Sequence, residues 1–286
     1  MHLPRLSLAG LLVTALLSPA PEPADAAPRP QWRLRFSDGF DTPAPRGAFS
    51  DCDHFPDTGR AYCGGLTGRT RADWWAYPDG WPDTATQRAY PVGGRYDPAT
   101  TVWISGGRLH LRLWRGPDGD VHSAAVVPKP MMGLRYGRYE ERFRVSRTAV
   151  GYKSAHLLWP VDEAGCRGCE IDFPEFEWTG TIHAFTHPKG GGRQDAFDTG
   201  ALWTSWHTSV IEWTPSGVAY FLDGRLIGRS VSGVPDRPMS WILQNEAALD
   251  GSRAAPGSRA QLDVDRVRGW SWAGAAQTPR ARTADR

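Results

Sequence analysis

The 286-residue sequence lacks an excess of charge of either sign, having 33 basic and 31 acidic residues. The formal charge of +2 is too balanced for a protein that binds nucleic acid mainly by attracting phosphates. The single asparagine, Asn245, starts no glycosylation sequon. Phosphate-binding glycine loops, dinucleotide fingerprints and the G-x-S-x-G nucleophile motif are also missing. No motif in the sequence therefore points to nucleotide-dependent chemistry or to a serine hydrolase.

Long apolar runs are missing too, apart from residues 6–17 near the start of the chain. That run is shorter than a membrane span, follows Arg5, and precedes Ala24-Asp25-Ala26, a pattern that signal peptidases accept. We therefore predict a signal peptide over residues 1–26, cleaved near Ala26. The expected product is a secreted monomer with no membrane or nucleic-acid partner.

Cysteine is scarce, with four residues in the chain. In a secreted protein, pairing between sequence neighbours is the simplest of three possible connectivities, joining Cys52 to Cys63 and Cys166 to Cys169. Zinc is the alternative for the C-x-x-C pair at 166–169, but a second such pair is missing. We expect two local disulfides.

Short β-type segments fill the rest of the chain, and long helical periodicity is absent. The clearest turn is Asp223-Gly224, which predicts a tight hairpin between two such segments. Without an internal repeat, the segments favour one all-β sandwich over residues 27–273, with long loops over 40–100 and a disordered tail over 274–286. The predicted strands are Trp32–Phe36, Thr101–Ile104, Arg108–Trp114, Tyr136–Val145, His156–Trp159, Glu170–Trp178, Thr181–Thr186, His207–Trp213, Val218–Leu222, Arg225–Arg229, Met239–Gln244 and Gln261–Trp272.

One segment, Glu170–Glu177 (EIDFPEFE), concentrates carboxylates. Side chains two apart on a strand share a face, so Glu170 and Asp172 project together. A β-bulge at Pro174 would return Glu175 to that face, with Glu177 as a fourth acid, while Ile171 and Phe173 enter the core.

Neighbouring carboxylates raise one another's pKa, which suits a division between a nucleophile and a protonated acid. A calcium site and a solvated face paired with arginines are the alternatives for this cluster.

The motif EIDFPE resembles the E-x-D-x-x-E signature of glycoside hydrolase family 16 in its bulged form. Further segments agree in order: FSDGFD at 36–41, YGRYEERFRVS at 136–146, TIHAFTH at 181–187, WHTSVIEWTPSGVAYFLDGRLIG at 206–228 and LDVDRVRGWSW at 262–272. The resemblance implies a concanavalin A-like β-jelly roll of two curved antiparallel sheets with an open cleft. It also implies a retaining endo-glycosidase in which Glu170 is the nucleophile, Glu175 the acid/base, and Asp172 lies between them.

The sequence departs from the family at Gly151–Pro160 (GYKSAHLLWP), where many members carry G-x-W-P-A-F-W-L-L-P. Lys153 and Leu157 stand where those members have tryptophans. Because such tryptophans line the sugar cleft, we hypothesise that Lys153 and His156 favour an anionic or amino-substituted sugar.

Further candidates come from strand alternation and from the resemblance. Zinc binding by the pair His183 and His187 would need a third ligand that the sequence does not indicate. The resemblance also implies a structural calcium near Asp265, while no cofactor is required for catalysis. A non-catalytic carbohydrate-binding jelly roll and a polysaccharide lyase acting on an anionic glycan are the alternative functions. The predicted substrate-binding residues are Arg142, His156, Trp159, Trp178, His183 and Gln244.

Overall fold

The computed structural model describes residues 30–55 and 60–275. The predicted signal peptide and the tail beyond Ala275 lie outside the described residues. The strands are β1 (Pro30–Asp38), β2 (Trp74–Ala76), β3 (Gly94–Tyr96), β4 (Val102–Ser105), β5 (Arg108–Arg115), β6 (Val121–Pro128), β7 (Gly137–Arg147), β8 (Tyr152–Pro160), β9 (Glu170–Glu177), β10 (His183–His187), β11 (Asp195–Asp198), β12 (His207–Thr214), β13 (Gly217–Leu222), β14 (Arg225–Ser230), β15 (Met239–Ala247) and β16 (Arg259–Ala275). The helices are short: α1 (Gly68–Asp73), α2 (Thr84–Gln87), α3 (Pro98–Thr101), η1 (Lys129–Met131) and η2 (Ala164–Cys166).

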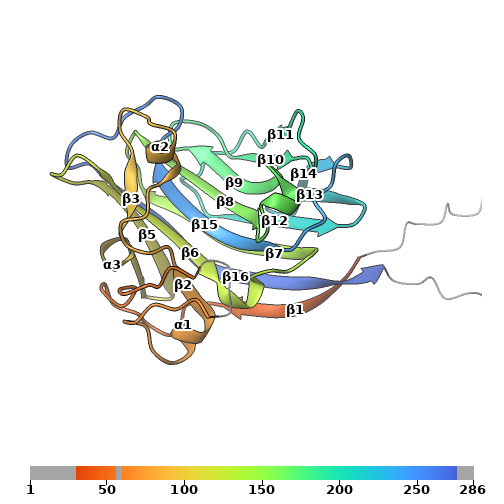
Figure 1. Cartoon of the computed structure of the whole chain (residues 1–286), viewed down its shortest axis with the longest axis horizontal. Coiled ribbons are helices and arrows are strands. Elements are labelled where there is room, and N and C mark those ends of the chain that lie inside the picture. Colours follow the sequence, from red (N-terminus) through yellow and green to blue (C-terminus); the bar gives the residue numbers. More distant parts are fainter. Residues whose placement is uncertain (1–29, 56–59, 276–286) are drawn as a thin grey trace, which may run out of the picture.

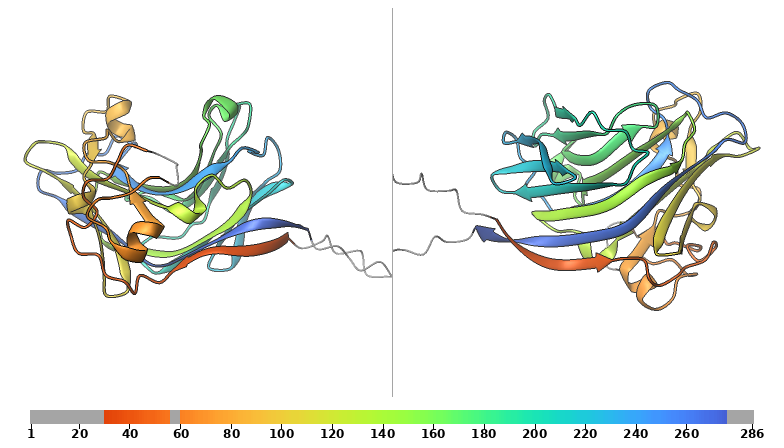
Figure 2. Two further views of the ribbon diagram at one scale, coloured as in Figure 1. Left: turned by 60° about the horizontal axis from the view of Figure 1, so that its bottom comes forward. Right: turned by 180° about the vertical axis from the view of Figure 1, so that it is seen from behind.

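The strands form two curved layers, seen from two sides in Figure 2. The front layer has the order β11-β10-β9-β8-β15-β6, with β2 also paired to β6. The back layer has the order β5-β16-β7-β12-β13-β14, and β1 runs beside β16 (Figure 1). All of these pairings are antiparallel, while β3 adds to β6 in parallel. The predicted sandwich of two curved antiparallel sheets is confirmed.

Strand β6 belongs to both layers. Its residues Ala124 to Val126 pair with β15 of the front layer, whereas Val121 and His122 pair with β5 of the back layer. Seven of its eight positions are buried. A strand enclosed in this way has no alternation between apolar and polar residues, so sequence periodicity does not reveal it.

The core lies between the layers and follows from alternation along each strand. On β5, for example, Leu109, Leu111 and Leu113 are fully buried while the residues between them point outward. Four tryptophans are also fully buried in this core: Trp74, Trp75, Trp213 and Trp241. Part of the chain's tryptophan content, 14 residues in all, therefore packs the core.

Twelve predicted strands are present, with ends that differ by a few residues. Four further strands were not predicted: β2 and β3, which have three residues each, β6, and the four-residue edge strand β11. The predicted loops over 40–100 contain α1, α2, β2, β3 and α3. The hairpin at Asp223-Gly224 is confirmed, since Leu222 pairs with Arg225 and both turn residues have positive φ.

Both predicted disulfides are present, Cys52–Cys63 and Cys166–Cys169. No helix within residues 30–55 and 60–275 is long and apolar enough to span a membrane.

Candidate active site

Strand β9 carries the carboxylate motif in the middle of the front layer, between β8 and β10. Glu175 pairs with Ala155 and Asp172 pairs with Leu157, so β9 has one residue more than β8 in this interval. The same extra residue occurs against β10. The predicted bulge is therefore confirmed, and Pro174 lies within it.

The bulge sorts the side chains of β9 between two environments. Ile171 and Phe173 are 0% and 1% exposed and belong to the core, as predicted. Glu170, Asp172 and Glu175 all face a cleft on the other side of the strand.

The cleft has a volume of about 880 Å³ and opens on the outward face of the front layer. Its floor comes from β8, β9, β10 and β15, and its rim from loops around α2, β3 and η2. Acidic side chains lie on the floor, and aromatic side chains surround them. The side chains that line the cleft include Tyr77, Trp81, Lys153, Trp159, Glu170, Asp172, Glu175, Phe185, His187, Gln244 and Glu246.

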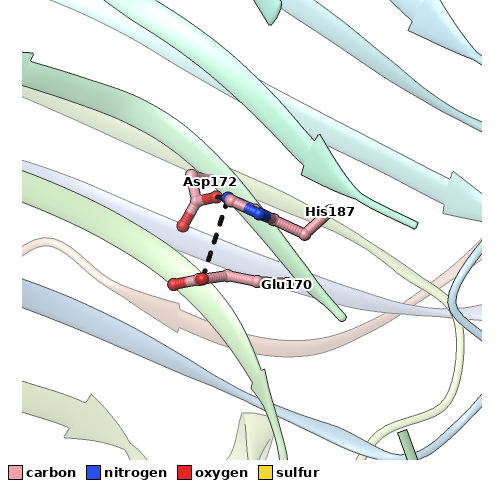
Figure 3. A group of neighbouring side chains, drawn as sticks. All are labelled: Glu170, Asp172 and His187. Atoms are coloured by element: carbon pink, nitrogen blue, oxygen red, sulfur yellow. Dashed lines mark ion pairs between the residues drawn. The ribbon is translucent and has the colours of Figure 1, made fainter. Parts of the chain in front are cut away.

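Glu170, Asp172 and His187 form one group, drawn in Figure 3. His187 lies opposite Glu170 in the strand pairing, and its Nε2 is 3.8 Å from Glu170 Oε2 and 3.5 Å from Asp172 Oδ2. Burial raises the pKa of Glu170 well above its ordinary value, and the neighbouring Asp172 raises it further, while His187 opposes the change. Burial, followed by the charge of Glu175, also raises the pKa of Asp172.

The same group has the composition of a cation site, because its three ligand atoms lie within 4.8 Å of one another. Calcium takes six to eight oxygen ligands, more than these side chains supply. The group therefore fits the calcium alternative poorly. Among the described residues, no comparable group of three surrounds Asp265, whose Oδ2 pairs with Arg142. A structural calcium there stays a prediction.

Lys153 contacts Glu175 on the other side of the carboxylate row. It comes from β8, is 6% exposed, and directs its Nζ at Glu175 Oε1. Burial alone lowers the pKa of this ammonium group, but the charges of Glu175, Glu246 and Glu177 together raise it above its ordinary value. Lys153 is thus charged, and it neutralises part of an acidic cleft floor.

Two further acids lie near Lys153, Glu246 in the cleft floor and Glu177 outside the cleft lining. Burial raises the pKa of Glu177 to about 7, and burial together with the charge of Asp83 raises the pKa of Glu246 to about 7. Both accept backbone hydrogen bonds, Glu177 from Leu249 at 3.0 Å and Glu246 from Thr84 at 2.9 Å.

Two of the predicted substrate-binding residues lie in the cleft. Trp159 and Gln244 both line it, on the neighbouring strands β8 and β15. The Nε1 of Trp159 donates a hydrogen bond to Glu163 at 2.9 Å, which fixes the indole at the rim.

His156 and Trp178 do not line the cleft, so their prediction as binding residues is wrong. On β8, Lys153, Ala155, Leu157 and Trp159 face the cleft, and His156 therefore points between the layers. It is fully buried there, 2.8 Å from the carboxylate of Glu141 on β7. Trp178 is 3% exposed, packs in the core and donates to Ser154 at 2.9 Å.

Arg142 and His183 are also misplaced by the prediction. Arg142 lies on β7 of the back layer, on the face away from the core, where it pairs with Asp265 and lies over Trp206. His183 shares a strand face with His187 but lies beyond the bulge, and its Nδ1 is 2.9 Å from the carbonyl oxygen of Thr181. Neither residue lines the cleft.

His187 is the main site residue that the prediction passed over in favour of His183. The sequence contained a signal for it, because alternation places His183, Phe185 and His187 on one face. Only the pairing register shows which histidine is opposite Glu170.

The disulfide Cys166–Cys169 ends immediately before Glu170. Both cysteines are buried, and the covalent link closes the loop that leads from β8 into β9. The first catalytic candidate therefore follows a constrained turn.

A comparison of the sequence with protein families agrees with this geometry. Residues 108–244, which include the bulged E-x-D-x-x-E strand, match the model of glycosyl hydrolases family 16. In this part of its sequence, and in its fold, the chain is similar to glycosyl hydrolase family 16. The family match and the solved structures of the same fold together support a glycosidase, an enzyme that hydrolyses O-glycosyl bonds.

Solved structures with the same fold include laminarinases and β-glucanases. The laminarinase of Rhodothermus marinus has 22% identity and a TM-score of 0.63, over 86% of this chain and 99% of that chain. The β-glucanase of Bacillus licheniformis has 16% identity and a TM-score of 0.60, over 84% and 98%. The catalytic domain of an endo-1,3-β-glucanase (laminarinase) of Thermotoga petrophila has 17% identity and a TM-score of 0.60, over 86% and 100%. No curated protein matches the chain in sequence.

Proposed function

We propose that this protein is a family 16 glycosidase that cleaves a β-linked glucan within the glucan chain, by a double displacement that retains the anomeric configuration. The observation that carries the proposal is the bulge of β9, which turns Glu170 and Glu175 toward one cleft with Asp172 between them. Two carboxyl groups on the same side of a short segment are the equipment of a retaining glycosidase.

In the first step, the carboxylate of Glu170 attacks the anomeric carbon and forms a glycosyl ester, while Glu175 gives its proton to the departing glycosidic oxygen. In the second step, Glu175 takes a proton from water, and the resulting hydroxide attacks the same carbon and releases Glu170. Two inversions at one carbon give net retention.

Asp172 and His187 prepare Glu170 for this role. Burial raises the pKa of both Glu170 and Asp172, and Asp172 raises the pKa of Glu170 further, so the pair favours sharing one proton. His187 stabilises the remaining negative charge from 3.8 Å. Attack requires the shared proton to lie on Asp172, which leaves Glu170 as the carboxylate.

The substrate proposal rests on the shape of the cleft and on the relatives. The cleft is open, and Tyr77, Trp81 and Trp159 offer apolar ring surface on which sugar rings stack. The similar solved structures are named as laminarinases and β-glucanases. A β-glucan accounts for both observations.

The two other functions considered from the sequence lose support. A lyase would need a base and a cation at a uronate, but His156 is buried between the layers and Arg142 lies on the back layer. Lys153, which suggested an anionic sugar, already pairs with Glu175. A binding module has no need for a buried acid pair with shifted pKa values.

We further propose that the protein acts outside the cell. Two disulfides are the expected chemistry of an oxidising compartment, and they agree with the predicted signal peptide. Detection of a product beginning near Ala27 in the culture medium would support this, and retention of the whole chain in the cell would contradict it.

The test is a reducing-end assay on β-1,3-glucan, mixed-linkage glucan, agar, carrageenan, chitosan and a uronate polymer. Glu170→Gln is the active-site variant, and Glu212→Gln, on the back layer, is the matched control. We expect cleavage of a β-glucan, lost by at least 1,000-fold in the first variant and kept in the second. NMR of early products should show the β-anomer. An α-anomer would overturn retention, and silence on every polymer would overturn the assignment.

A further inference from the structure

The back layer carries a second hollow, on the face turned away from the core. Because Leu109, Leu111 and Leu113 of β5 are fully buried, Arg112 and Trp114 point outward. A pocket of about 320 Å³ lies there. Its lining joins β5 to β16, α3 and the loop at 46–47: Arg46, Gly47, Ala99, Thr100, Arg112, Trp114 and Arg259.

Strand pairing gathers arginines around this pocket. Arg259 lies opposite Trp114, and Gln261 lies opposite Arg112 on one side and Arg147 on the other. Arg46 comes from the loop and stacks over Trp103, with its guanidinium carbon 4.0 Å from the ring centre. We call Arg46, Arg112, Arg147 and Arg259 the arginine cluster.

The charge of the arginine cluster is uncompensated. In the part of the chain that the structure describes, none of its four guanidinium groups pairs with a carboxylate. Burial lowers the pKa of Arg112, and the charges of Arg46, Arg259 and Arg147 lower it further. Elsewhere on the back layer, Arg138 pairs with Glu140 and Glu212.

Grouping four cations without an acid costs free energy, and an anionic ligand would remove that cost. Guanidinium groups bind carboxylate and sulfate in a bidentate manner. The indole of Trp114 and the methyl of Ala99 add apolar surface of the kind that contacts a sugar ring. A volume near 300 Å³ is at the lower end for a ligand site.

We propose that the arginine cluster binds an acidic polysaccharide through its carboxylate or sulfate groups. The site is separate from the cleft, since the two are lined by different residues on opposite layers. It would hold the enzyme on a charged polymer while the cleft remains open to its own substrate.

Affinity electrophoresis of the full chain tests the proposal, with polygalacturonate for carboxylate, κ-carrageenan for sulfate and β-1,3-glucan as the neutral polymer. Glu170→Gln serves as the parent protein, so that hydrolysis does not shorten the polymers. Into it we would place Arg112→Ala with Arg259→Ala. The matched control is Arg33→Ala with Arg35→Ala, two exposed arginines of β1 that remove the same charge.

We expect at least tenfold weaker retardation by an acidic polymer in the cluster variant and less than a twofold change in the control. Binding should weaken with added salt. Retardation by β-1,3-glucan should be the same in all three proteins, because it reports the cleft alone. Equal loss in the cluster variant and the control would overturn the proposal by showing general charge attraction.

Two further outcomes would also overturn it. One is the absence of retardation by both acidic polymers. The other is binding of inorganic sulfate or phosphate, measured by calorimetry, that is as tight as binding of the polymers, which would make the pocket a site for small anions. Failure of the β-glucan hydrolysis assay leaves this test unaffected. Thermal melting of each variant identifies any loss of folding, and Arg112→Gln then replaces the double variant.

Discussion

The ammonium group of Lys153 lies against the carboxylate of Glu175, the residue to which we assign proton transfer. Lys153 is buried, and the other charges near it are the acids Glu177 and Glu246. Without Lys153, the acids Glu175, Glu177 and Glu246 would lose the buried cation that they share. Lys153 therefore has a structural role as well as a position beside the reacting groups.

Lys153→Met should destabilise the fold by about 2–3 kcal/mol, because breaking a buried ion pair leaves the partner charge uncompensated. This loss is at the low end for a buried ion pair, because the side chain of Glu175 is 21% exposed and water partly compensates its charge. Urea unfolding measures the change. Glu175→Gln should cost less, and combining the two substitutions should cost less than the sum of the singles. Strict additivity would show that the two residues are not coupled.

His187→Gln should lower kcat by about 10- to 100-fold with little effect on KM, because His187 positions the Glu170 and Asp172 pair without binding sugar. The histidine opposes the rise in the pKa of Glu170. Without it that pKa rises further, so Glu170 becomes a carboxylate only at higher pH. The acid limb of the kcat/KM profile should therefore move to higher pH. His183→Gln, on the same strand but outside the cleft, should leave the limb in place.

Glu246→Gln should make the protein more stable above neutral pH. The folded-state pKa of Glu246 is raised to about 7 from a reference of 4.5, so the folded state binds the proton more tightly than the unfolded chain. Its contribution to stability is present below pH 4.5 and is lost as the pH rises through 7, amounting to about 3 kcal/mol at most. Denaturation at pH 5 and pH 8 should show a smaller difference in the variant than in the parent. An unchanged difference would mean that Lys153 already compensates the charge.

Two tryptophans adjoining the catalytic strand should respond in opposite ways. Trp159→Ala should raise KM for a β-glucan by about fivefold to tenfold with little effect on melting temperature, because its ring lines the cleft. Trp178→Phe should lower stability by about 2 kcal/mol, through lost core volume and the lost hydrogen bond to Ser154, and leave KM unchanged. An increase in KM for the second variant would contradict its placement in the core.

The sequence was sufficient for the strands that alternate and for the bulge in β9. The acids Glu170 and Asp172, followed by Pro174, predicted the bulge without knowledge of the strand pairing. It was insufficient where a strand is buried on both faces, as in β6, because periodicity is then lost. The sequence also does not predict which of the two layers a strand joins. Alternation along β7 separates Arg142 from the core residues, but it does not tell whether the face of Arg142 belongs to the cleft or to the back of the molecule.

His156 shows the same limit at the scale of one residue. The sequence identifies the region in which Lys153 and His156 lie, yet adjacent positions on a strand point to opposite sides. The register with β9 and β15 decides that Lys153 faces the cleft and His156 meets Glu141 in the core. Long-range pairing supplies this information, and no local pattern contains it.

Strand β6 hydrogen-bonds to both layers, so the floor of the cleft and the arginine cluster are parts of one continuous network of backbone hydrogen bonds. The two surfaces consequently keep a fixed orientation, facing away from each other. A protein attached by its back layer would present its cleft outward, away from the polymer that holds it. It would then cut a second polymer that lies alongside the first.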